Sequence, residues 1–151
     1  MALIDGVSDL FFKSGTTEQK GGIAMDRELT SRRVVLVVVG IIFIFGIFPL
    51  TMVWPSGWAW HMGGPSMYLQ MILGIYATLG VFLLLAARNP LKRLSLIWFA
   101  VWSSVVHAGI MAAQALLYPE HRGHLLGDVP ALLLIAIVLA LPTPRAAKAG
   151  A

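Results

Sequence analysis

Histidine is the residue of this sequence with the widest chemistry, because an imidazole binds metals and haem and exchanges protons near neutral pH. The chain has four histidines, His61, His107, His121 and His124, and no cysteine. Without cysteine there is no thiolate nucleophile and no ligand for an iron–sulfur cluster. The sequence also lacks a glycine-rich phosphate loop, a serine–histidine–aspartate order and an HExxH motif. These absences argue against a hydrolase or a phosphoryl-transfer enzyme.

His107 lies inside a long uncharged run and is the first candidate site residue. Ser103 and Ser104 precede it by four and three positions, and Met111 and Gln114 follow it by four and seven. All five residues therefore share one face of a helix. On such a face His107 is a candidate haem or metal ligand, a proton-relay residue or a contact for a quinone-like head group. The structural alternative is a neutral imidazole bonded to a serine hydroxyl or a backbone carbonyl.

A second candidate site contains His121, His124 and Asp128, which occupy positions i, i+3 and i+7. On a helix they would share one face, and two imidazoles with a carboxylate suit zinc, copper or iron. His61 and Met62 from an earlier loop could complete the set. The proline and glycines of the same stretch favour turns instead, with Asp128 capping the next helix.

Methionines near His61 suggest a further metal. Met62, Met67 and Met71 follow it closely, and methionine together with histidine suits copper(I). Met67 and Met71 are equally explained as packing residues.

The elements that must position these residues are membrane spans. The chain is 58% apolar and 12% charged, against about 45–50% and about 25% in soluble domains. A run of about 20 uncharged residues rises about 30 Å as a helix, which matches a hydrocarbon core. The sequence predicts an all-α integral membrane protein, a four-helix bundle over residues 34–142. The expected spans are 34–53, 67–87, 94–118 and 125–141, with Pro49 bending or ending the first.

Lysine and arginine predict the orientation of the spans. Of 11 such residues, ten lie in the segments 1–33, 88–93 and 143–151, whereas Arg122 is alone in the other two connections. Both termini are therefore predicted on the cytoplasmic side, with the histidines in the outer half. This distribution forms no basic stripe and does not favour binding to nucleic acid.

Depth predicts which side chains pair. Asp128 lies about 6 Å below the level of His124, which is the depth of Gln114 and not of His107. This depth favours a hydrogen bond between Asp128 and Gln114 over a pair of Asp128 with His107. Depth also argues against a haem held by both His61 and His107, because His61 precedes the second span whereas His107 lies near the middle of the third.

Small residues predict the helix contacts, because close approach drives association in lipid. The second span carries Gly74, Thr78 and Gly80, and the third carries Gly109 and Ala113. The second and third spans are expected to make the closest contact.

The first 33 residues form a predicted cytoplasmic tail. Leu3, Val7, Leu10 and Phe11 give one apolar face of a short helix, and residues 14–22 are typical of a flexible linker. The amphipathic segment is either an interfacial anchor, a docking arm for a partner, or a frayed tail.

Three stretches between residues 67 and 142 resemble a known group: GIYATLGVFLLLAARNP, SSVVHAGIM and HLLGDVPALLL. They are similar to small bacterial membrane proteins related to the DoxX-like group. The resemblance implies a four-helix bundle in a bacterial inner membrane and favours a redox-linked accessory role. It transfers no catalytic residue.

Three functions are therefore expected in this order. The first is a non-catalytic accessory subunit of an inner-membrane assembly, which binds a partner protein or a second copy through the N-terminal arm and helix surface. The second is a protein that holds haem or a transition metal at His107 or at the outer histidines. The third is a small oligomeric transporter.

Overall fold

The computed structural model describes residues 22, 25–60 and 66–144. Every regular element in this part of the chain is helical, and none is a strand. In the described residues, four helices are long and apolar enough to cross a membrane: Met25–Val53, Met67–Arg88, Pro90–Leu117 and Pro119–Ala140. The prediction of an all-α fold with four candidate spans is confirmed for this part of the chain. The first helix begins at Met25, although residue 34 was expected.

The chain divides into two compact units, residues 1–31 and residues 32–151. In the first unit, residues 25–31 are helical, and the Thr30 hydroxyl donates to the Asp26 carbonyl over 2.8 Å. The predicted amphipathic segment of residues 1–11 lies outside the described residues.

The first span changes its helical geometry near its end. A π-helical turn, η1 (Ile42–Gly46), leads into α2 (Ile47–Val53). Pro49 lies within α2, and a proline removes the hydrogen bond to the carbonyl four residues earlier. The helix nevertheless continues to Val53 and does not end at Pro49. A short helix, α3 (Pro55–Trp58), follows at once.

The two middle spans have clear start and stop signals. The helix α4 (Met67–Arg88) begins where the Ser66 hydroxyl accepts a hydrogen bond from the Leu69 amide over 3.2 Å. A proline follows its end, and Pro90 opens the 3₁₀ helix η2 (Pro90–Arg93). The helix α5 (Leu94–Leu117) continues directly from it.

The fourth span combines two kinds of helix. The stretch η3 (Pro119–Leu125) is a 3₁₀ helix and α6 (Asp128–Ala140) is an α-helix. Gly127 is the N-cap of α6 and makes no side-chain cap bond. Asp128 is therefore the first residue of α6, and the alternative in which it caps the helix is wrong.

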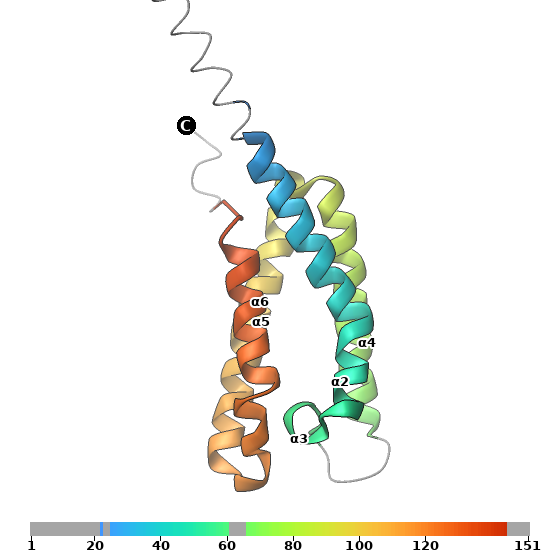
Figure 1. Ribbon diagram of the computed structural model, residues 1–151, viewed down its shortest axis with the longest axis vertical. Coiled ribbons are helices and arrows are strands. Elements are labelled where there is room, and N and C mark those ends of the chain that lie inside the picture. Colours follow the sequence, from blue (N-terminus) through green and yellow to red (C-terminus); the bar gives the residue numbers. More distant parts are fainter. Residues whose placement is uncertain (1–21, 23–24, 61–65, 145–151) are drawn as a thin grey trace, which may run out of the picture. The chain divides into compact units, whose positions relative to one another are not determined.

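The spans associate as two pairs, seen in Figure 1 as α5 beside α6 and the first span beside α4. In the second pair, a Cβ atom added to Gly80 would lie 2.6 Å from the Gly40 carbonyl oxygen. Gly74 and Gly109 have no such neighbour within 4 Å. The expected close contact between the second and third spans is wrong, because Gly80 packs against the first span instead.

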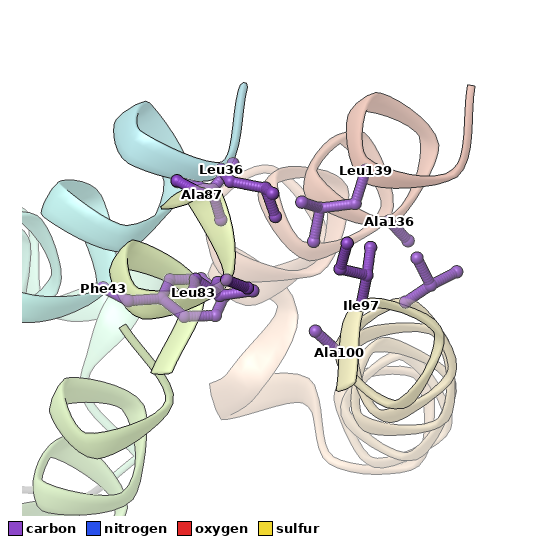
Figure 2. Packing of buried hydrophobic residues seen from close by; sticks show 11 residues of the cluster. Leu36, Phe43, Leu83, Ala87, Ile97, Ala100, Ala136 and Leu139 are labelled. Atoms are coloured by element: carbon purple, nitrogen blue, oxygen red, sulfur yellow. The ribbon is translucent and has the colours of Figure 1, made fainter. Parts of the chain in front are cut away.

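All four spans meet in one hydrophobic cluster, shown in Figure 2. It contains Leu36 from the first span, Leu83 from α4, Ile97 from α5 and Leu139 from α6. At the same end, Arg32 donates to the Pro142 carbonyl and the Trp98 indole donates to the Pro144 carbonyl. The two helix pairs are thus joined at the end that carries the 88–93 connection.

Candidate functional site

A cavity of about 580 Å³ lies at the other end of the bundle. The second buried cluster there consists of Ala108 and Met111 of α5 and Val129 and Leu132 of α6, and Trp60 and Tyr76 pack against it. The cavity is lined by residues of α2, α3, α4, α5 and α6, and most of its wall is apolar. Its volume and its few polar groups are typical of a site for a small molecule.

The main polar group on the wall is a pair formed by Tyr76 of α4 and His107 of α5. The Tyr76 hydroxyl lies 3.2 Å from His107 Nδ1, within hydrogen-bond distance. Phe43 packs against the Tyr76 ring edge-on, with ring centroids 5.1 Å apart and planes at 73°. The π-helical turn that contains Phe43 therefore supports the ring that holds His107.

Helical spacing identified most of the α5 face correctly. Ser103, His107, Met111 and Gln114 all line the cavity. Ser104 does not: it is 2% exposed, and its hydroxyl donates to the Ala100 carbonyl over 2.8 Å. The structural alternative named a serine or a backbone carbonyl as the partner of His107, but the partner is Tyr76.

Asp128 is buried and hydrogen-bonded at the end of the cavity next to η3. Its Oδ2 atom accepts a hydrogen bond from the Trp60 indole over 2.9 Å and lies 2.8 Å from His124 Nδ1. Gln114 is not among its partners, so the predicted bond between Asp128 and Gln114 is wrong. Asp128 instead fixes Trp60, whose ring forms part of the cavity wall.

Trp60 contacts both histidines of η3. Its ring stacks on His124 with centroids 3.9 Å apart and lies 4.9 Å from the ring of His121. Residues three apart eclipse one another in a 3₁₀ helix, which explains why His121 and His124 meet one indole. His124 is 1% exposed and belongs to the protein interior.

The predicted metal set does not converge in the described part of the chain. No group of three His, Cys, Asp or Glu side chains is arranged there to hold a metal ion. His124 and Asp128 bond each other, while His121 lies against Trp60. His61 and Met62 lie outside the described residues.

Two of the three methionines proposed for copper are at the surface of α4. Met67 and Met71 are both exposed, and neither lines the cavity.

The short helix α3 is held against η3 by contacts that only glycine permits. A Cβ atom on Gly127 would lie 2.2 Å from the Gly57 carbonyl oxygen. A Cβ atom on Gly123 would lie 2.3 Å from the Ser56 carbonyl oxygen. This close approach brings Trp58 and Trp60 to the cavity wall.

Several residues at the cavity wall are exposed on the apolar outer surface of the helices. Tyr68 and Ile72 of α4 are 80% and 40% exposed, and Val106 and Ile110 of α5 are 58% and 55% exposed. The cavity therefore borders a surface that suits lipid and not water.

Sequence reasoning did not identify Tyr76 or Trp60 as cavity residues. The signal for Trp60 is its indole N–H, which requires a partner when buried. Tyr76 lies nine residues after the start of α4, and His107 lies ten residues before the end of α5. Counting depth along both spans would have placed the two side chains at one level.

The model of one family, described as a family of unknown function (DUF6632), matches residues 29–149. No curated protein and no solved structure matches the chain. The match has no bearing on the resemblance to DoxX-like proteins, which stays a prediction.

Proposed function

We propose that this chain, which belongs to the DUF6632 family, is a multi-pass membrane protein that binds a small lipid-soluble molecule in the cavity between α4 and α5. Membrane insertion is supported by four helices with mean hydropathies between 1.7 and 2.9 over their most apolar stretches. Large apolar side chains such as Phe45, Met67 and Leu117 are exposed along them, which lipid would cover.

The proposed orientation places both termini in the cytoplasm of a bacterium. Ten of the 11 lysine and arginine residues belong to the tails and to the connection after α4, as the positive-inside rule requires. The cavity then lies in the outer half of the membrane, and the cluster that joins all four spans lies in the inner half.

One observation carries the proposal: an apolar cavity has polar groups on its wall and borders the lipid-facing surface. His107, Gln114 and Asp128 supply these polar groups. Exposed residues of α4 and α5 border the lipid. A molecule with an apolar body and a polar head would enter sideways from the bilayer and orient its head toward these groups.

The test uses a matched pair of serines on α5. Ser103 lines the cavity, whereas Ser95 is exposed and does not line it. The protein is placed in lipid nanodiscs, and quenching of Trp58 and Trp60 by a brominated alkylphenol is measured. We expect saturable quenching in the natural protein and in Ser95→Phe. In Ser103→Phe, the added ring fills the cavity and the saturable component disappears. Equal quenching in all three proteins would contradict the proposal.

The three functions expected from the sequence each rest on a different observation. An accessory subunit that binds a partner through residues 1–33 rests on a segment of which only residues 22 and 25–33 are described. A haem or metal at His107 would use Nε2, because Nδ1 faces Tyr76. Transport would need an oligomer, because the described residues of one chain include few buried charges that could line a pathway. All three stay predictions.

A further inference from the structure

We propose that the cavity recognises a quinone-type head group, a ring that carries an oxygen either as a carbonyl or as a hydroxyl. This inference rests on the proposed function and names the class of ligand. It concerns binding alone and includes no electron transfer.

The first observation in favour is that Tyr76 and His107 can each act as the donor or the acceptor of the hydrogen bond between them. The hydroxyl and Nδ1 share one hydrogen bond of 3.2 Å, which either atom can donate. When Tyr76 donates, Nδ1 is the acceptor and the neutral imidazole carries its proton on Nε2. When Nδ1 donates, Nε2 is left as an acceptor and the tyrosine proton is free to turn elsewhere.

The consequence is that one pair serves two ligand states. With Nε2 protonated, His107 donates to a carbonyl oxygen. With Nε2 bare, it accepts from a hydroxyl group. Both residues are half-buried and line the cavity, and no described residue bonds Nε2. A site built for a fixed donor or a fixed acceptor would discriminate strongly between these two states, because the wrong one leaves a buried group unpaired.

The second support is a further ambivalent group on the same wall. Gln114 also lines the cavity, and its amide both donates and accepts. It lies seven residues beyond His107, about 10 Å along α5. A ring with oxygens on opposite sides can lie between two such groups.

The third support is the aromatic lining. Trp58, Trp60, Tyr68 and Tyr76 all line the cavity. Aromatic side chains favour stacked or edge-on contact with a flat ring over contact with a flexible chain. A lipid alcohol would use the hydrogen bonds but not this part of the wall.

The experiment compares three probes in nanodiscs: decylbenzoquinone, its quinol and decylbenzene, which has the same tail and no oxygen. The natural protein is expected to bind the quinone and the quinol with similar affinity, each about fivefold or more above decylbenzene, the value of one hydrogen bond. His107→Phe should reduce this preference to the part that Gln114 supplies and keep decylbenzene binding. Tyr76→Phe should weaken both oxygenated probes, whereas Tyr68→Phe, an exposed tyrosine of the same wall, should weaken neither.

The position of the His107 ring proton distinguishes a hydrogen bond to the oxygen of the probe from apolar packing alone. In ¹⁵N-histidine NMR, bound quinone should place the His107 proton on Nε2, and bound quinol should place it on Nδ1. An unchanged tautomer, or an oxygen preference that is undiminished in His107→Phe, would overturn the inference. If all three probes bind equally and Ser103→Phe removes them all, the inference fails and the proposed function stands. If Ser103→Phe affects none of them, the proposed function itself fails.

Discussion

At the residue scale, Asp128 is the shared hydrogen-bond partner of Trp60 and His124 at the end of the cavity next to η3. Its Oδ2 atom bonds the Trp60 indole and faces His124 Nδ1, and both Asp128 and His124 are almost fully buried. Removing this shared acceptor leaves the buried His124 and the part-buried Trp60 indole without a partner, which costs more than one hydrogen bond is worth.

We therefore expect Asp128→Ala to lower the free energy of unfolding by about 1–3 kcal/mol. Asp128→Asn keeps an acceptor oxygen and should lose less. Denaturation in detergent, followed by circular dichroism, measures both variants. Glu120→Ala is the control, because Glu120 is exposed in the same outer stretch. If the Asp128→Ala protein were as stable as this control, the bonds of Asp128 to Trp60 and His124 would not contribute to stability as predicted.

At the element scale, the contact between the first span and α4 depends on two facing glycines. A Cβ atom on Gly80 would meet the Gly40 carbonyl oxygen at 2.6 Å, and backbone cannot give way as a flexible side chain can. Gly80→Ala should destabilise the protein by about 1–3 kcal/mol. Gly74→Ala in the same helix meets nothing within 4 Å and should be neutral or stabilising. Denaturation in detergent compares the free energies of unfolding of the two variants. Equal values would contradict the close contact between Gly80 and Gly40.

The elements themselves were largely predictable, and their partners were not. Uncharged runs placed α4 and α5 to within one residue of their ends, since hydropathy and the flanking prolines mark where each span stops. The first helix was predicted too short, because charged residues at 26–33 continue a helix without adding hydropathy. The pairing of spans failed because small residues occur on several faces, and only the fold selects the face that is used.

The candidate site was predicted only in part, because spacing in the sequence identifies residues on one face of a helix but not contacts between helices. Ser103, His107, Met111 and Gln114 share one helix, so their spacing alone places them on one wall. Tyr76 belongs to another span, and no periodicity within α5 can point to it. Trp60 reaches the wall because α3 packs on η3 through Gly123 and Gly127, a backbone contact with no sequence period.

At the scale of the whole molecule, two helix pairs are joined at one end and enclose a cavity at the other. The proposed orientation assigns the joined end to the cytoplasm. The absence of native cysteine makes this testable with single-cysteine variants. In intact cells, Arg122→Cys should react with an impermeant maleimide, and Ser31→Cys should react only after lysis. The reverse pattern would show that the chain is inverted.

The central claim is that the cavity holds a lipid-soluble molecule. The most direct measurement is mass spectrometry of the small molecules that co-purify with the protein from its native membrane, quantified per chain. The natural protein and Ser95→Phe should release the same non-phospholipid compound in near-stoichiometric amount, and Ser103→Phe should release far less. Equal yields from all three proteins, or no compound beyond bulk lipid, would contradict the account.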